Sequence, residues 1–204
     1  MNDSSAKKLV LEPLKISCTS TDCGNGLHCF LQKRRTAQRH GPCRSCGTDL
    51  VDWSRVHARD LADVLHTFEA LRSERIRHHF WHVELSQHAV NYALRKGKSG
   101  IREAAAARVI TALVNVNPNY DGRQTPGEGS KNPLHYAQHA TACCCRHCLE
   151  EWHGIPRERT LTDSEVAYCA TLMAMFVEER VPDLQDAPLK VPPLKKTKPP
   201  EEKP

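Results

Sequence analysis

Cysteine and histidine, which bind soft and borderline metal ions, gather in two short stretches of this sequence. The chain has ten cysteines and twelve histidines among 204 residues. The first stretch reads CTSTDCGNGLHC and is followed further on by GPCRSCG, and the second reads HATACCCRHCLEEWHG. Such clusters favour metal binding, with catalysis, a disulfide and simple core packing as the alternatives.

The first stretch has the spacing of a structural zinc site. Cys43 and Cys46 form a C-x-x-C pair followed by Gly47, and this spacing lets two thiolates bind one ion while the backbone amides of the turn face the sulfurs. Cys18 and Cys23 form a looser pair, which is also followed by glycine. Together the four thiols satisfy tetrahedral zinc, and they predict a small zinc-ribbon-like module.

Two neighbours leave the ligand set of this module open. Cys29 is left over, and either Cys29 or His28 could replace one of the four cysteines. Four cysteines could also hold iron instead of zinc. The alternative without a metal is a set of buried, inert thiols.

The second stretch predicts another metal site, built from two thiols and two imidazoles. Cys145 and Cys148 form its C-x-x-C pair, with His139 upstream and His153 downstream. In one unbroken helix Cys145 and His153 would lie about 12 Å apart along the axis, so a shared ion requires the helix to break within CCCRHC. Cys144 is the substitute ligand because it lies four residues before Cys148. Packed thiols and a redox dithiol are the alternatives.

A local excess of positive charge lies between the two halves of the first cluster. The formal net charge is +5 and the sequence pI is about 8.7. No acidic residue occurs between Asp22 and Asp49, and lysine and arginine in such a stretch can contact phosphates without reading sequence. The alternative is a solvated face of an interaction protein. The basic residues predicted to contact nucleic acid are Lys33, Arg34, Arg35, Arg39 and Arg44.

The elements that must position these residues are predicted to be mainly helical. Apolar spacing predicts a helix over much of Ala58 to Arg77, and VELSQHAVNYALRKG predicts a second that stops near Gly97. A third covers IREAAAARVITALV. Asn132-Pro133 is a good helix start, and LTDSEV begins the last helix with a capping box. We expect LVLEPLKIS to form a strand.

These elements predict a small helical domain with a Cys/His knuckle, preceded by the zinc-ribbon-like module. The module is expected over residues 1–54, the helical domain over 55–181, and a disordered Pro/Lys-rich tail over 182–204. No apolar run is long enough for a membrane span, and MNDSSAKKLVLEPLK lacks the apolar stretch of a signal peptide. We therefore expect a cytoplasmic protein without a membrane partner, whose thiols stay reduced and available to metal.

The motifs DGRQTP and AQHATACCCRHCLEEWHGIP resemble a bacterial family of domains of unknown function, family forty-one eighty-six. The resemblance covers about half the chain, from roughly Arg77 to Arg180, and the N-terminal cysteine module looks like an addition to it. Cys143 departs from the family motif, which makes it the least suitable ligand of the cysteine triplet. No activity comes with the family. The family motif maps onto Gln138, His139, Ala140, Thr141, Cys144, Cys145, Arg146, Cys148, Trp152 and His153.

Two classes of function fit these residues, beside a third, a redox or iron–sulfur protein, which rests on the four N-terminal cysteines. The first is a zinc-binding protein that acts as a nucleic-acid-associated or interaction module. The alternative is a metal-dependent hydrolase or nucleic-acid-processing enzyme, in which the metal at residues 139–153 keeps an open position for water and Asp121, Glu150 or Glu151 serves as general base. A closed site with four protein ligands would count against the enzyme.

Overall fold

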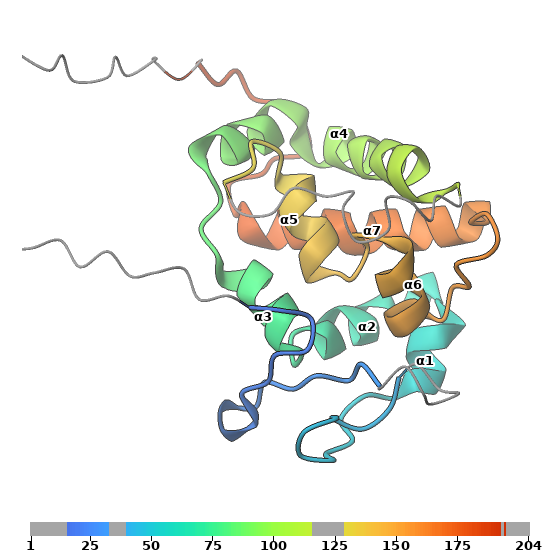
Figure 1. The fold of residues 1–204 in the computed structure, drawn as a ribbon. Helices are drawn as coiled ribbons and strands as arrows, with labels where there is room; N and C mark the ends of the chain where they lie inside the picture. Colours follow the sequence, from blue (N-terminus) through green and yellow to red (C-terminus); the bar gives the residue numbers. More distant parts are fainter. Residues whose placement is uncertain (1–15, 33–39, 116–128, 193, 195–204) are drawn as a thin grey trace, which may run out of the picture.

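The computed structural model describes residues 16–32, 40–115, 129–192 and 194, and these residues form helices without any strand (Figure 1). The predicted mainly helical class is therefore confirmed. The helices are α1 (Trp53–Ala58), α2 (Val64–Leu71), α3 (Arg75–His82), α4 (Gln87–Leu113), α5 (Pro133–Ala140), α6 (Arg146–His153) and α7 (Asp163–Arg180), with the short 3-10 helices η1 (Cys23–Asn25) and η2 (Leu61–Asp63).

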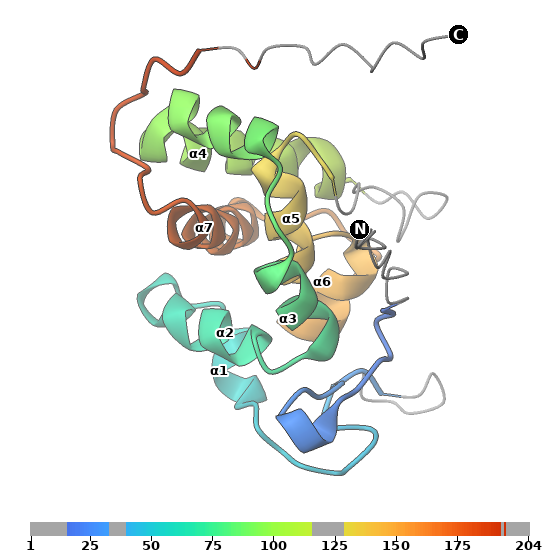
Figure 2. The same ribbon diagram turned by 90° about the vertical axis from the view of Figure 1, so that its left-hand side faces the viewer.

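Helix α7 is the centre of the fold. It contacts α4, α5 and α2, and Figure 2 shows it end-on with α4 on one side and α2 on the other. Residues from Tyr168 to Val177 are buried on most sides of the helix, as expected for a helix with neighbours all round. The predicted capping box is confirmed, because Thr162 and Glu165 bond to each other's backbone N–H at the start of α7.

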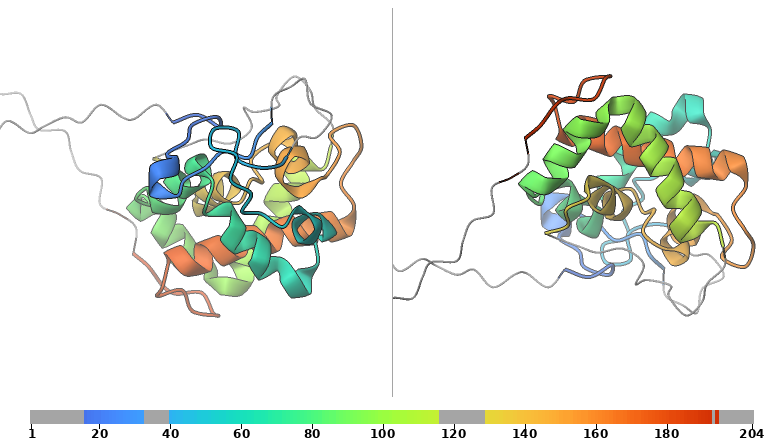
Figure 3. Two further views of the ribbon diagram at one scale, coloured as in Figure 1. Left: turned by 90° about the horizontal axis from the view of Figure 1, so that it is seen from below. Right: turned by 90° about the horizontal axis from the view of Figure 1, so that it is seen from above.

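Helix α4 covers α7 and bends near its middle. The prediction of two helices that meet near Gly97 is close to the structure, because Gly97 has φ 65° and ψ 174° inside α4. Figure 3 (right) shows the two arms that result. This position favours glycine, since φ is positive and a Cβ at Gly97 would lie 2.7 Å from the carbonyl carbon of Ala187 and the carbonyl oxygen of Asp186.

The single helix predicted over Ala58 to Arg77 is wrong. Arg59, with φ 52°, ends α1, and α2 and α3 are separate helices. The break before α3 comes from a partner distant in the sequence. The backbone N–H of His28 donates to the Ser73 carbonyl at 2.8 Å, and the Arg75 N–H donates to the His28 carbonyl at 2.8 Å. This short parallel bridge takes the chain out of the helical conformation.

The N-terminal segment, residues 16–32 and 40–51, lies against α3 and α6 rather than apart from them (Figure 3, left). Phe30 is 1 % exposed, and its ring packs edge-on against Trp152 and Trp53 with centroids 5.9 and 6.0 Å away. The predicted strand lies outside the described residues except for Ile16 and Ser17, which are not in a strand. The zinc-ribbon comparison and the domain boundaries stay predictions.

The first residues of the predicted tail pack against α4. The side chain of Leu184 is buried, the Lys98 N–H donates to the Gln185 carbonyl at 2.9 Å, and the Leu189 N–H donates to the Leu94 carbonyl at 2.8 Å. The remainder of the tail, apart from residue 194, lies outside the described residues. Among the helices that the structure describes, none is long and apolar enough to cross a membrane.

Candidate metal centres

The structure gathers two groups of possible metal ligands. The first, here called the N-terminal centre, consists of Cys23, His28, Cys43 and Cys46. The second, here called the buried thiol centre, consists of Cys144, Cys145 and Cys148. Within each group the donor atoms all lie within 4.8 Å of one another, so each could hold a metal ion.

The N-terminal centre has the spacing of a tetrahedral site. The Sγ atoms of Cys23 and Cys43 are 3.8 Å apart, and the Sγ of Cys46 lies 3.4 Å from Nδ1 of His28. Bonds of about 2.0 to 2.3 Å to a tetrahedral zinc ion require donor atoms about 3.3 to 4 Å apart. These two distances fall in that range and all four donor atoms lie within 4.8 Å of one another, so three thiols and one imidazole could hold a zinc ion in a closed site.

Tight backbone turns present the cysteines. In the knuckle, the Gly47 N–H donates to the Cys43 carbonyl at 2.8 Å, and the Cys43 N–H donates to the Thr48 carbonyl at 2.8 Å. Gly47 has φ 76°, in the left-handed region where glycine is preferred. Cys23 begins η1, which ends at Gly26 with φ 73°. The C-x-x-C spacing and the glycines that follow Cys23 and Cys46 predicted these turns, because the turns are formed by residues close in the sequence.

Hydrogen bonds to the sulfur atoms lower the pKa values of both cysteines of the knuckle, Cys43 and Cys46. Burial alone would raise the pKa of Cys43, but backbone hydrogen bonds at Cys29, Cys46 and Ser45 outweigh it and bring the pKa to about 6. The hydroxyl and backbone of Thr48 lower the pKa of Cys46. Thiolates are the form that binds metal, so the knuckle favours the ligand state.

His28 takes the place that the sequence analysis gave to Cys18. Its side chain is 5 % exposed, and its backbone is fixed between Ser73 and Arg75 at the start of α3. Burial lowers the pKa of His28, and hydrogen bonds with Cys43 and Cys46 more than offset this, so the net pKa is raised. The predicted ligand set had Cys18 in this place. The position of His28 depends on backbone hydrogen bonds to residues at the start of α3, which are distant in the sequence.

The buried thiol centre forms where the chain turns between α5 and α6. The expected helix break is present, since α5 ends at Ala140 and α6 begins at Arg146. Cys145 is the N-cap of α6, and its Sγ accepts from the Cys148 N–H at 3.5 Å. The Sγ atoms of Cys144 and Cys148 are 3.4 Å apart, and all three thiols of the centre are buried.

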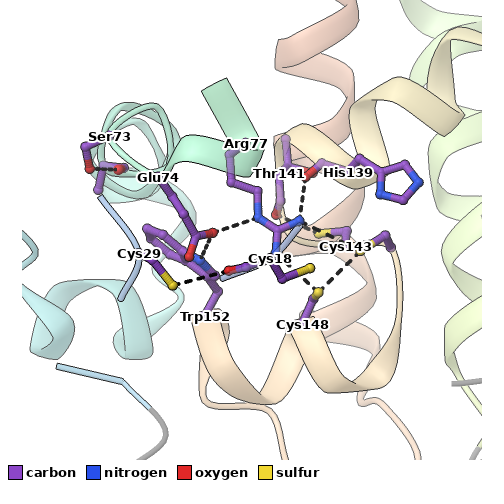
Figure 4. A network of polar contacts seen from close by, with 12 residues as sticks. Cys18, Cys29, Ser73, Glu74, Arg77, His139, Thr141, Cys143, Cys148 and Trp152 are labelled. Atoms are coloured by element: carbon purple, nitrogen blue, oxygen red, sulfur yellow. Dashed lines mark hydrogen bonds and ion pairs between the residues drawn. The ribbon is translucent and has the colours of Figure 1, made fainter. Parts of the chain in front are cut away.

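A buried arginine lies against these thiols (Figure 4). Nη2 of Arg77 is 3.2 Å from the Sγ of Cys148, and Nη1 is 3.9 Å from the Sγ of Cys144. Nε donates to Glu74 at 2.9 Å, and the same carboxylate oxygen accepts from Nε1 of Trp152 at 2.7 Å. Neither Arg77 nor Glu74 stood out in the sequence, although the Arg/Glu spacing of three residues in a helix start is a recognisable ion-pair spacing.

The Cys148 thiol carries the lowest pKa of this group. Hydrogen bonds from Cys144, Cys145 and Cys18, together with the charge of Arg77, lower its pKa well below the ordinary thiol value, against the effect of burial. The pKa values of Cys144 and Cys145, and of the neighbouring Cys18, are raised, with the hydrogen bond to Cys148 among the causes. One thiolate shared among neighbouring thiols is a natural starting point for a metal cation.

The two histidines predicted for this site lie elsewhere. The ring of His139 stacks on Phe80 at a centroid distance of 4.3 Å, and only its carbonyl faces Arg77, which donates to it at 2.8 Å. Nε2 of His153 lies 3.0 Å from the Thr141 carbonyl oxygen, and its Nδ1 lies 3.4 Å from the Tyr168 hydroxyl. The structure therefore brings together the predicted thiols and the substitute Cys144, but not the imidazoles.

The positions predicted for nucleic acid and for catalysis are only partly described. Arg44 is exposed on the knuckle of the N-terminal centre, whereas Asp121 and the basic residues from 33 to 39 lie outside the described residues. Glu150 pairs with Arg157 at 2.9 Å. Nε2 of His147 is 2.5 Å from Glu151, and this contact raises the pKa of His147.

Comparison with known proteins places the helical part of the chain in a family. No solved structure matches this protein. A family described as Domain of unknown function (DUF4186) matches residues 65–178, which run from α2 into α7 and contain the whole buried thiol centre. The N-terminal centre lies before the matched region. Because the match covers more than half of the 204 residues, this protein belongs to the DUF4186 family.

Proposed function

We propose that this protein binds zinc at its N-terminal centre. We further propose that the knuckle of this centre, the turn from Cys43 to Cys46, acts as a nucleic-acid-associated or interaction module. The observation that carries the proposal is the gathering of three thiols and one imidazole within 4.8 Å. Cysteine and histidine with tetrahedral spacing suit zinc better than the hard cations, which prefer oxygen. Four protein ligands make a closed site, which favours a structural role.

The order of the ligands along the chain supports a role for the basic residues. The basic residues at positions 33–39 lie between His28 and Cys43, two ligands of the N-terminal centre, and Arg44 lies within the knuckle itself. A metal bound to both ends closes this segment into a loop and reduces its conformational freedom. Positive charge concentrated in a metal-closed loop suits contacts with phosphates.

Binding to mixed DNA and RNA fragments tests the role of the loop. At low salt we expect weak binding whose affinity falls steeply as salt rises, because each phosphate contact releases counterions. The double variant Arg34→Glu and Arg35→Glu should abolish it, and Arg102→Glu, on α4, should leave it unchanged. Absence of binding at low salt, or binding that the double variant retains, would remove nucleic acid from the proposal and leave a protein partner.

Metal content and protease resistance test the zinc centre itself. Cys43→Ala removes a ligand of the N-terminal centre, so we expect the loss of one zinc ion per chain and rapid cleavage before residue 53, because the metal stabilises this segment. If the variant kept the full metal content and the resistance of the unaltered chain, the centre would not be a metal site.

The hydrolase alternative receives less support. Arg77 contacts two thiols of the buried thiol centre, and two of the three carboxylates predicted as general bases, Glu150 and Glu151, pair instead with Arg157 and His147. We therefore propose a binding role and assign no reaction to residues 139–153.

A further inference from the structure

We propose that Cys18, Cys144, Cys145 and Cys148 form a second zinc centre, with four thiolate ligands, that ties the N-terminal segment to the family domain. This proposal uses none of the ligands of the N-terminal centre and does not depend on nucleic-acid binding, but the zinc counts and averaged ligand numbers expected below assume that the N-terminal centre is also filled. It adds a ligand from outside the matched family region, since Cys18 lies before residue 65.

Three of the four ligands are already arranged for a metal. Cys144, Cys145 and Cys148 place their Sγ atoms within 4.8 Å of one another, and the closest measured pair is 3.4 Å apart. The Cys145-x-x-Cys148 turn has the hydrogen bond from backbone N–H to sulfur that accompanies metal-binding cysteine turns. The start of α6 adds the positive end of a helix dipole, which stabilises thiolates.

Cys18 is the neighbour that supplies the fourth thiol. Figure 4 shows its sulfur beside that of Cys148, with which its thiol is hydrogen bonded. The turn that carries it is fixed by the Cys29 thiol, which donates to the Cys18 carbonyl at 3.2 Å, and by a bond from the Ser20 N–H to the Ser17 carbonyl at 3.0 Å. Cys18 is an exposed residue beside the buried group and is not one of the three thiols that lie within 4.8 Å of one another, so the proposal requires its turn to move closer to Cys144 and Cys145 when the metal binds.

Charge explains why Arg77 belongs beside this centre. Zinc with four thiolates carries two negative charges, and buried charge is costly unless a counter-charge lies close. The guanidinium of Arg77 is 2 % exposed and contacts two of the four sulfurs, at 3.2 and 3.9 Å. Glu74 and the His139 carbonyl hold its other N–H groups, so Arg77 is a positioning residue with a fixed orientation toward the sulfurs.

The binding step is a simple exchange of protons for a cation. Zinc forms four bonds to sulfur, the thiols that still carry protons release them to solvent, and no electron is transferred. A centre of three thiols and one water is the rival, and so is the set with His139 and His153. The rivals differ from the proposal in the number of sulfur ligands and in the role of Cys18.

The metal content of the full chain and of Cys18→Ala tests the proposal. By native mass spectrometry after a chelator challenge, we expect two zinc ions in the unaltered chain and one in Cys18→Ala. The matched control is Cys143→Ala, which removes a buried thiol next to Cys144 and should keep both ions. Cys18 lies in an exposed turn, so its replacement leaves the helical core intact.

X-ray absorption at the zinc edge of the unaltered chain identifies the ligands independently. The two proposed centres together predict an average of about 3.5 sulfur and 0.5 nitrogen ligands per zinc, with sulfur at about 2.3 Å. With both His139 and His153 as ligands, the average would instead be about 2.5 sulfur and 1.5 nitrogen. The proposal would be overturned if Cys18→Ala retained two zinc ions, or if the unaltered chain held a single zinc ion that Cys18→Ala also kept. The nitrogen-rich average in the absorption spectrum would overturn it as well.

Discussion

The guanidinium of Arg77 donates to a carboxylate, to a carbonyl and to two thiols while almost fully buried. A buried cation needs partners at every donor, and α3 supplies Glu74 one turn away on the same helix start. Trp152 bonds to the same carboxylate and so connects α6 to this group. At the scale of single residues, these contacts determine how α3 meets the buried thiol centre.

Arg77→Ala should therefore destabilise the protein strongly. It leaves Glu74 buried without its cation, and breaking a buried pair in this way costs about 3–5 kcal/mol. Urea unfolding followed by circular dichroism would measure the loss. The control is Arg102→Ala, which breaks an exposed pair with Glu178 and should cost no more than about 1 kcal/mol. Equal effects of the two changes would contradict the assigned role.

Glu165 should make stability depend on pH in the acid range. Hydrogen bonds from Arg159 hold the pKa of Glu165 at about 2, below its ordinary value of 4.5. A carboxylate with a lowered pKa stabilises the fold above its unfolded pKa, and this contribution is lost as pH falls from about 5 toward 2. Because Arg159 is partly exposed, we expect a contribution on the order of 1–2 kcal/mol.

Unfolding of the unaltered chain and of Glu165→Gln at several pH values checks this. The difference in unfolding free energy between the two should be largest near pH 7 and should shrink steadily below pH 5. A difference that stays constant down to pH 3 would mean that the charge of Glu165 does not stabilise the fold.

At the scale of elements, local signals and distant partners each determine helix ends. Asn132 caps α5 with Pro133 at the first position, and Thr162 caps α7, as the sequence predicted, because each cap is made by residues within one turn. The end of α2 and the start of α3 could not be predicted in this way. They depend on the pairing of Glu74 with His28, and nothing in the local sequence marks that partner.

Gly97 should be essential to the bend in α4. Gly97→Ala should cost about 1–3 kcal/mol, because φ of 65° strains an alanine and its Cβ would meet the backbone of residues 186–187 at 2.7 Å. The control is Gly100→Ala three residues later, where the Cβ would touch only the flexible Lys96 side chain. That change should be neutral or stabilise the helix by about 0.5–1 kcal/mol. Thermal unfolding distinguishes the two variants. If Gly97→Ala left the free energy of unfolding unchanged, Gly97 would not be essential to the bend in α4.

The N-cap of α7 gives a second test at this scale. Thr162→Ala removes the side chain that accepts from the Glu165 N–H and should cost about 1 kcal/mol of unfolding free energy. Thr171→Ala is the comparison, since the Thr171 hydroxyl bonds only to the carbonyl of Ala167 within its own helix. Its effect should stay within about 0.5 kcal/mol. If both variants unfolded at the same urea concentration, the cap would have no role in stability.

At the scale of the whole molecule, two groups of thiols lie at the junction between the N-terminal segment and the family domain. The C-x-x-C pairs were readable in the sequence because their geometry is local. Cys23 and the substitute Cys144 were also predicted from the sequence, but the exchange of Cys18 for His28 in the N-terminal centre was left open, because the backbone of His28 is held by residues at the start of α3. The absence of His139 and His153 from the buried thiol centre could not be predicted, because the ring of His139 stacks on Phe80 and Nε2 of His153 lies beside the Thr141 carbonyl oxygen. Spacing therefore predicts the thiol turns, and the tertiary fold decides what completes them.

The number of zinc ions bound per chain tests the central claim, that the clustered thiols hold metal. The full chain, purified without chelators or added metal, would be analysed by elemental analysis against protein concentration, with native thiols titrated in parallel. We predict two zinc ions per chain, with most of the ten cysteines unreactive until the metal is removed. A folded chain that contains no metal and whose exposed Cys46 reacts at once would contradict the account.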